Sequence, residues 1–147
     1  MIITTRICRT AEETFRAGRD LAQEVREGDV VLMVGDLGSG KTTFVQGLVY
    51  GYGLFDPVTS PTFNIVHVYG PPDRRVIHAD LYRLSGMHEL ETVGLLDDVD
   101  DRAVMVIEWP ERLGGATPRD HYRVLLQVLD CDERYLTIER HGGRPRT

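Results

Sequence analysis

A glycine-rich segment at residues 35–44, GDLGSGKTTF, constrains the fold of this chain more than any other feature of its sequence. It matches the pattern G-x-x-x-x-G-K-[ST] through Gly35, Gly40, Lys41 and Thr42. In that pattern backbone N–H groups turn toward phosphate oxygens, the lysine binds the β- and γ-phosphates, and the threonine hydroxyl is a ligand of Mg²⁺. Lys41 is the only lysine among 17 basic residues, and the planar fork of arginine does not fit this loop as a point charge. The alternative interpretation is a glycine-rich turn with an incidental lysine.

The residues on both sides of the loop favour phosphate binding. Residues 30–34 form an apolar run that is typical of a strand buried on both faces of a parallel sheet. After Lys41, apolar residues recur at helical spacing, and Gly53 is typical of the end of a helix. This order of strand, loop and helix points the helix N-terminus at bound phosphates. The sequence therefore predicts a single α/β domain of the P-loop NTPase class, with a mostly parallel central sheet flanked by helices and a C-terminal β-hairpin.

The remaining patterns predict the other elements. A capping-box pattern at residues 10–13 predicts an N-terminal helix, and a short helix is expected at residues 87–92. We interpret the acidic run at residues 97–101 as a solvated loop or a partner surface. The predicted domain spans residues 1–141, and residues 142–147 are expected to be a disordered tail. The predicted strands lie at residues 63–69, 76–82, 103–107, 124–129 and 135–138, and the last two form the hairpin.

The composition argues against several functional classes. No apolar run approaches the roughly 18 residues of a membrane span, so no membrane partner is expected. The net charge of −6 argues against a surface that is wholly a nucleic-acid platform. Cys8 and Cys131 are far apart and match neither a redox pair nor a zinc pattern. We expect a cytoplasmic protein with reduced thiols.

Hydrolysis of a nucleotide needs an acidic group beside the phosphate loop. Glu108 closes the apolar run at residues 103–107, and ligands gather at strand ends in open α/β sheets. Asp80 projects from the polar side of a predicted alternating strand, next to His78. The alternatives are a solvated carboxylate for Glu108 and an ion pair with Arg83 for Asp80. His67 and His78 lack a compact metal-binding spacing, so we expect them to be polar-face residues.

The base of the nucleotide is constrained by a missing motif. Guanine-specific NTPases of the Ras type recognise their base through an N/T-K-x-D motif that contains a lysine. Lys41 is the only lysine and already belongs to the phosphate loop. ATP is therefore the expected nucleotide.

Four motifs in this order resemble the TsaE family of bacterial ATPases, and the resemblance extends over about residues 10–140. They are the phosphate loop, SPTF at residues 60–63, HADLYRL at residues 78–84 and IEWP at residues 107–110. The family serves in the threonylcarbamoyladenosine modification of tRNA. The resemblance implies a P-loop ATPase that works with the threonylcarbamoyl transferase subunit (TsaD-like) and its inactive paralogue (TsaB-like). It would reach tRNA through that complex, and ATP hydrolysis would reset the complex between turnovers.

The resemblance also implies roles for single residues. Thr42 and Glu108 are implied as ligands of Mg²⁺, and Asp80 as a residue needed for hydrolysis beside Lys41. Residues 60–63 resemble a switch-like segment, and Trp109 an active-site aromatic residue. The residues implied to bind the nucleotide are Ala11, Leu37, Gly38, Ser39, Gly40, Lys41, Thr42, Thr43, Trp109 and Arg134, of which Ala11 and Arg134 would lie on the adenine side.

Two other functions are compatible with a phosphate loop. A small-molecule kinase needs an acceptor pocket and usually an arginine-rich lid, and the only comparable segment, residues 112–119, is short and rich in glycine and proline. A nucleotide-binding module without hydrolysis is disfavoured by the presence of both Asp80 and Glu108. We therefore expect an ATPase that is slow alone and activated by its partners.

Overall fold

The computed structural model describes residues 1–36, 38–61, 66–82 and 102–142. Several predicted features lie outside these residues: Leu37, the helix at residues 87–92, the acidic run at residues 97–101 and most of the C-terminal tail. Among the described residues, no helix is long and apolar enough to cross a membrane.

The described strands form one seven-stranded sheet in the order β1-β7-β6-β2-β5-β4-β3. The central strands β6, β2, β5 and β4 run parallel, whereas β7, β1 and β3 pair antiparallel with their neighbours. The prediction of a mostly parallel sheet therefore holds for the centre only, because short turns join β3 to β4 and β6 to β7 and such turns require antiparallel pairing. The strands are β1 (Ile2–Cys8), β2 (Val30–Val34), β3 (Val66–Tyr69), β4 (Arg75–Asp80), β5 (Ala103–Glu108), β6 (His121–Val128) and β7 (Arg134–His141).

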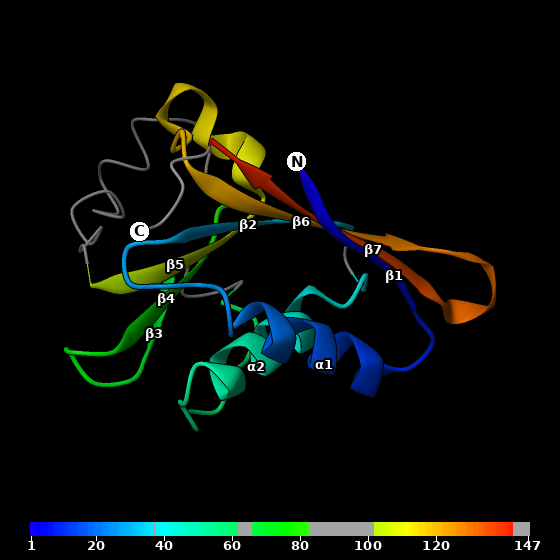
Figure 1. Ribbon diagram of the computed structural model, residues 1–147, viewed down its shortest axis with the longest axis horizontal. Helices are drawn as coiled ribbons and strands as arrows, with labels where there is room; N and C mark the ends of the chain where they lie inside the picture. The colour runs from blue at the N-terminus through cyan, green and yellow to red at the C-terminus, as the bar shows by residue number, and fades with distance from the viewer. Residues whose placement is uncertain (37, 62–65, 83–101, 143–147) are drawn as a thin grey trace.

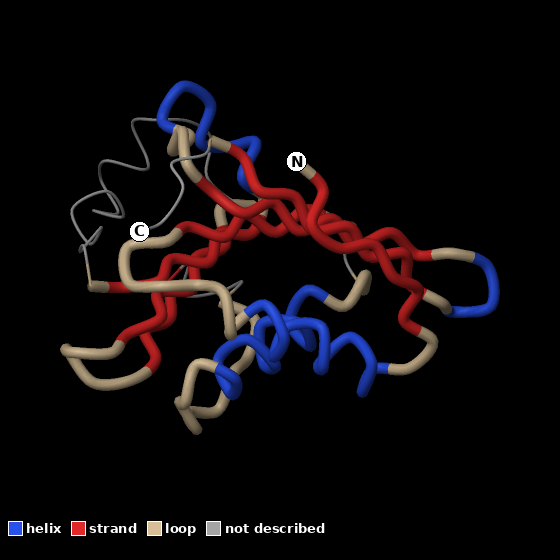
Figure 2. The backbone as a smooth tube through the Cα atoms, viewed as in Figure 1, coloured by secondary structure: helices blue, strands red, loops and turns tan. Residues whose placement is uncertain are grey.

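Two α-helices, α1 (Ala11–Leu21) and α2 (Lys41–Gly51), lie side by side on one face of the sheet (Figure 1). Phe44 and Leu48 of α2 belong to the larger core, which these helices form with strands of the sheet. The 3₁₀ segment η1 (Pro110–Ala116) lies on the opposite face (Figure 2), and its Leu113 belongs to a second core. A second 3₁₀ turn, η2 (Asp130–Asp132), connects β6 to β7. The α-helices that the structure describes therefore flank one face of the sheet only.

Glycines bring α1 and α2 into close contact. A Cβ atom at Gly18 would overlap the carbonyl oxygen of Phe44, and one at Gly47 would overlap the carbonyl oxygen of Phe15. A Cβ at Gly40 would lie 3.5 Å from the methyl group of Thr14. The beginnings of the two helices are therefore neighbours, and this places part of α1 beside the glycine loop.

Most of the local patterns led to the expected element. The capping box is confirmed, because Thr10 Oγ1 accepts a hydrogen bond from the Glu13 amide at 3.1 Å and the Glu13 carboxylate accepts one from the Thr10 amide at 3.3 Å. The strand at residues 30–34 is confirmed as β2, the strand that ends at Glu108 as β5, and the C-terminal hairpin as β6 and β7. α2 ends at Gly51, and Gly53 follows its cap with a φ of 90°.

Two predictions about strands were wrong or incomplete. β4 was expected to carry a polar face, but His78 is fully buried and Asp80 is only 6% exposed. The reason is that β4 lies inside the sheet, where its polar groups are satisfied by other side chains rather than by water. β1 was not predicted, because its threonines and arginine give only a weak apolar alternation. It forms an edge of the sheet by pairing with β7.

Candidate functional site

The glycine loop leaves the N-terminus of α2 without a side-chain cap. Gly38 and Gly40 have φ angles of 79° and 104°, a region that L side chains rarely adopt. Gly40 is the N-cap residue of α2 and provides no side-chain capping hydrogen bond, and the first turn carries no acidic residue. The first amide groups of a helix have no partner inside the helix, and the helix dipole adds partial positive charge there. The start of α2 is therefore suited to an anion.

Lys41 lies at this helix start with its ammonium group buried. Its Nζ donates a hydrogen bond to the Gly35 carbonyl at 2.6 Å and lies 3.8 Å from Glu108 Oε1. It also lies 4.5 Å from the centroid of the Trp109 ring, within range of a cation–π contact. The lysine therefore spans the loop and balances the charge of the buried carboxylate.

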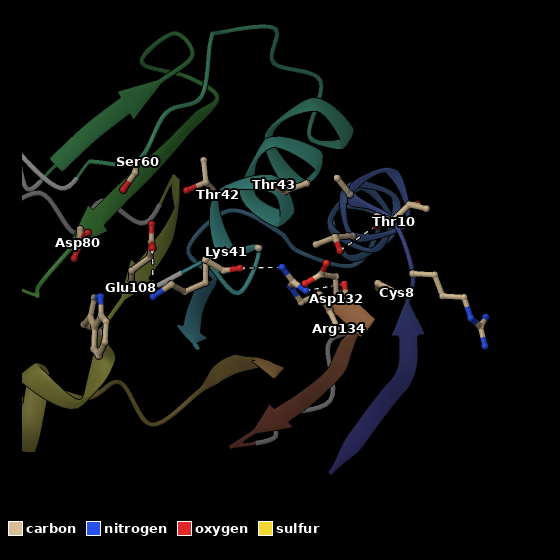
Figure 3. Close-up of a pocket in the computed structure, with 16 residues that line it drawn as sticks. Cys8, Thr10, Lys41, Thr42, Thr43, Ser60, Asp80, Glu108, Asp132 and Arg134 are labelled. Carbon is tan, nitrogen blue, oxygen red and sulfur yellow. Dashed lines mark hydrogen bonds and ion pairs between the residues drawn. The ribbon is translucent and has the colours of Figure 1, made fainter. Parts of the chain in front are cut away.

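Asp80 and Glu108 end neighbouring parallel strands. They are register partners in the pairing of β4 with β5, and both are buried. Asp80 Oδ1 accepts a hydrogen bond from the Tyr82 amide at 2.9 Å. Figure 3 shows Glu108 beside Lys41 and Asp80 at the same end of the pocket. Sequence reasoning placed Glu108 at a strand end and Asp80 on the polar side of a strand, and the register brings the two together.

His78 contacts the second oxygen of Glu108, and this contact was missed by sequence reasoning. His78 Nε2 lies 2.6 Å from Glu108 Oε2, and Nδ1 lies 3.4 Å from the hydroxyl of Tyr69. Burial raises the pKa of the Tyr69 hydroxyl above its ordinary value, and the charge of Glu108 adds to the rise although a hydrogen bond to Thr59 opposes it. A usable signal was the spacing of two between His78 and Asp80, which puts both on one face of β4.

Trp109 has a backbone conformation that is rare for a residue with a side chain. Its φ and ψ angles of 59° and 53° are left-handed. Such a conformation costs of order 1–3 kcal/mol and concentrates at functional sites. The indole ring lies 4.9 Å from the ring of Tyr82 and over the Lys41 ammonium group. The turn after β5 therefore directs the tryptophan ring to the predicted site.

Lys41, Asp80, Glu108 and Trp109 line one pocket with a volume of about 520 Å³, which lies in the usual range for small-molecule sites. Leu37 lies outside the described residues, and Ser39 is buried at the base of the loop. Residues that line the pocket but had no predicted role in it include Cys8, Thr10, Thr14 and Asp132. The predicted residues that line it are Ala11, Gly38, Gly40, Lys41, Thr42, Thr43, Ser60, Asp80, Glu108, Trp109 and Arg134.

The other end of the pocket is formed by β1, α1 and the start of β7. Figure 3 shows Cys8, Thr10 and Arg134 at this end, away from Asp80 and Glu108. The Arg134 guanidinium donates hydrogen bonds to the Ser39 and Gly38 carbonyls, both at 3.1 Å. Burial raises the pKa of the Cys8 thiol, although a hydrogen bond to Thr14 opposes the rise, so the group stays protonated near neutral pH. Through its hydrogen bonds to the Ser39 and Gly38 carbonyls, Arg134 connects β7 to the glycine loop.

The donor atoms of the pocket fit a magnesium–phosphate group. The described residues contain no cluster of three or more His, Cys, Asp or Glu side chains that could hold a metal ion by themselves. The Thr42 hydroxyl and the Glu108 carboxylate line the same pocket and offer oxygen ligands. Mg²⁺ is commonly bound by one or two protein oxygens together with substrate phosphates, so this sparse donor set suits it.

Comparison with known proteins gives one consistent result. The family model for the threonylcarbamoyl adenosine biosynthesis protein TsaE matches residues 8–136. A TsaE protein of Streptomyces coelicolor is 46% identical over 137 residues, which cover 86% of this chain and 90% of the relative. One of Treponema pallidum is 36% identical, covering 90% of this chain and 97% of the relative. The crystal structure of YdiB from Bacillus subtilis matches with a TM-score of 0.79 at 28% identity, covering 97% of this chain and 88% of that one.

Proposed function

This chain belongs to the TsaE family, and we propose on that basis that it is an ATPase of the machinery that makes threonylcarbamoyladenosine in tRNA. In this proposal the protein binds ATP with Mg²⁺ and hydrolyses it, and it does not itself transfer the threonylcarbamoyl group. The observation that carries the proposal is the convergence of Lys41, Asp80 and Glu108 on one pocket at the uncapped N-terminus of α2.

The glycine loop and Lys41 bind the phosphates in this proposal. Amide groups at the start of α2 donate to phosphate oxygens, which serve as the cap that the helix lacks. When ATP binds, the Lys41 ammonium group gives up its hydrogen bond to the Gly35 carbonyl and binds the β- and γ-phosphates. Its ammonium group then stabilises the charge that develops as the terminal phosphoryl group leaves.

Thr42 and Glu108 would hold Mg²⁺, and Asp80 would act on water. When bound, Mg²⁺ neutralises charge on the β- and γ-phosphate oxygens. Asp80 accepts a hydrogen bond from the attacking water and directs it at the γ-phosphorus, from the strand end beside Glu108. The positions of the two carboxylates support this division between metal binding and water activation. Glu108 lies 3.8 Å from the Lys41 ammonium group, whereas Asp80 accepts a hydrogen bond from the Tyr82 amide.

The adenine would bind at the end of the pocket near Ala11 and Arg134. Both residues line the pocket, and Figure 3 shows Arg134 on the side away from the two carboxylates. The phosphates occupy the other end in this arrangement, near Glu108 and Trp109. The position of Arg134 at the end of the pocket away from Asp80 and Glu108 supports this orientation of the nucleotide.

The partners in this proposal are a TsaD-like transferase subunit and its TsaB-like paralogue, in the cytoplasm, with tRNA reached through them. ATP hydrolysis would reset that complex between turnovers. Ser60 supports activation by a partner, because it is exposed and also lines the pocket. A partner that binds at Ser60 changes the wall of the pocket.

Phosphate release from ATP tests the proposal directly. The purified protein is measured alone and with the transferase heterodimer, and we expect slow release alone and faster release with the heterodimer. Lys41→Ala should abolish both rates. Arg112→Ala is the matched control, since Arg112 is exposed on η1 and is not among the pocket residues. An unchanged rate with the heterodimer, together with phosphorylation of a small hydroxylated metabolite, would establish a kinase instead.

Two further variants separate metal binding from hydrolysis. Glu108→Ala should weaken Mg²⁺-dependent binding of a fluorescent nucleotide, whereas Asp80→Ala should bind it normally and fail to hydrolyse ATP. Identical behaviour of the two variants contradicts the division of roles. The emission of Trp109, the only tryptophan, should change when Mg-ATP is added.

A further inference from the structure

A row of hydrogen bonds leads from the exposed residue Thr59 to the buried carboxylate of Glu108. The Tyr69 hydroxyl donates to the Thr59 carbonyl at 3.2 Å and lies 3.4 Å from His78 Nδ1. His78 Nε2 lies 2.6 Å from Glu108 Oε2. His67 Nδ1 is a further neighbour of the same hydroxyl, at 3.3 Å.

We propose that Tyr69 and His78 form a link through which the position of the backbone at Thr59 sets the orientation of the Glu108 carboxylate. This inference rests on the proposed function and deepens it, because it concerns how the same site is regulated. Tyr69 and His78 are positioning residues here, since neither is among the residues that line the pocket.

The two ends of the link differ in their access to water. Thr59 and Ser60 are exposed, whereas Tyr69, His78 and Glu108 are buried at 4%, 0% and 3% exposure. Water is therefore a poor substitute for any bond in the buried part, and a change at one bond is passed to the next. A displacement of Thr59 and Ser60 can therefore change the environment of Glu108 by this route without a movement of β4 or β5.

The Tyr69 hydroxyl has one proton, and its possible acceptors are the Thr59 carbonyl, His78 Nδ1 and His67 Nδ1. The carboxylate of Glu108 can only accept, so its 2.6 Å contact with His78 Nε2 places a proton on that nitrogen, as in the Nε2–H tautomer of a neutral imidazole. Nδ1 of that tautomer is then an acceptor. The hydroxyl donates to Thr59 in the arrangement observed. If the Thr59 carbonyl moves away, the Tyr69 hydroxyl donates to His78 Nδ1 instead. This makes the Nε2–H group of His78 a stronger donor to Glu108.

The exposed end of the link is tied to both α2 and the pocket. Gln46 of α2 donates to the Val58 carbonyl at 3.1 Å, one residue before Thr59. Ser60, one residue after Thr59, lines the pocket. A ligand or partner that moves Ser60 therefore moves the acceptor of the Tyr69 proton.

Mg²⁺-dependent binding of a fluorescent ATP analogue tests the link without requiring turnover. Tyr69→Phe removes only the hydroxyl and should raise the Mg²⁺ concentration for half-saturation several-fold while leaving metal-free affinity unchanged. His78→Asn keeps a polar group near Tyr69 but loses the hydrogen bond to Glu108. It should raise that Mg²⁺ concentration about 10–100-fold, the usual effect of removing a partner of a metal ligand. His78→Gln places an amide near Nε2 and should recover most of the loss. Tyr50→Phe, at an exposed tyrosine, is the matched control.

A double-mutant cycle tests the connection to the surface segment. Gln46→Ala releases the Val58 carbonyl and should change the Mg²⁺ half-saturation in the wild-type background but not in Tyr69→Phe. Equal shifts in both backgrounds, or none in either, overturn the link. In the wild-type protein, ¹⁵N NMR of His78 should report protonation of Nε2 alone, and a protonated Nδ1 would also overturn it.

The controls distinguish the failure of this inference from the failure of the proposed function. If the wild-type protein binds no nucleotide in a Mg²⁺-dependent manner, the proposed function fails. If wild type binds and Lys41→Ala does not, but Tyr69→Phe and His78→Asn match wild type, the proposed function stands and the link is wrong. Tyr69→Phe keeps the buried ring, so the test does not depend on the folding of the histidine variants.

Discussion

The N-termini of α1 and α2 are neighbours at the same pocket, yet they are built in opposite ways. Thr10 and Glu13 satisfy the start of α1 through a reciprocal capping box, and Glu12 and Glu13 add negative charge to its first turn. The start of α2 has Gly40 as its cap residue, no capping side chain and no acid in its first turn. The chain therefore supplies the partners that α1 needs, whereas the start of α2 has no side-chain cap and is suited to an anionic ligand. We expect changes at α1 to affect stability, and changes at α2 to affect binding and turnover.

The largest effect in this comparison is expected from Lys41→Ala. In the proposed function the Lys41 ammonium group acts on the transferring phosphoryl group, so its removal should lower the rate of ATP hydrolysis by about a hundredfold or more. The fold should persist, because the carboxylate of Glu108 keeps its hydrogen bond to His78. Steady-state phosphate release and circular dichroism measure the two properties, and normal turnover would show that the site lies elsewhere.

A smaller effect is expected from Gly40→Ala. At a φ of 104° a side chain is strained, so the substitution should lower the free energy of unfolding by about 1–2 kcal/mol. The loop can escape the strain only by changing the direction of its amide groups, so nucleotide affinity should fall by about tenfold, which corresponds to roughly 1.4 kcal/mol. Gly115→Ala is the control, since a Cβ there meets no atom within 4 Å. Comparable losses of affinity in both variants would contradict this explanation.

Thr10→Ala tests the opposite side of the comparison. It removes the acceptor of the Glu13 amide, and the loss of a cap lowers the free energy of unfolding by about 1 kcal/mol. Thr10→Ser should retain the cap and most of the stability. Urea denaturation measures the difference, and nucleotide affinity should change less than in Gly40→Ala. A larger loss of affinity than of stability would mean that Thr10 serves the ligand and not only the helix.

The smallest effect is expected from Glu12→Gln. Glu12 is an exposed residue that pairs with Arg16 at 2.5 Å on the surface of α1. Exposed pairs of this kind contribute roughly 0.3 kcal/mol, which salt reduces further. Thermal denaturation at low and high salt should show a small difference that disappears at high salt, with nucleotide binding unaltered. A marked change in binding would show that charge at α1 reaches the ligand.

The same contrast explains which features the sequence could predict. The glycine loop, the capping box and the carboxylate at the end of β5 are encoded within a few residues, so local patterns were sufficient. The environment of His78 depends on Tyr69 and Glu108, which come from two other strands, so alternation along β4 could not show that the polar face formed by His78 and Asp80 is buried. β1 was missed for a related reason, since its place depends on β7 at the far end of the chain.

The pairing of β1 with β7 has a consequence for how the molecule is made. Ile7 and Cys8 lie opposite Tyr135 and Arg134, and the amino group of Met1 donates to the Arg140 carbonyl at 3.0 Å. β1 is the first described strand to be synthesised, and it can join the sheet only after β7, the last one, has been synthesised. Contacts so distant in sequence slow folding, because a long loop has to close before they form. A nascent chain that already contains the glycine loop still lacks Arg134, so the wall of the pocket is completed only at the end of synthesis.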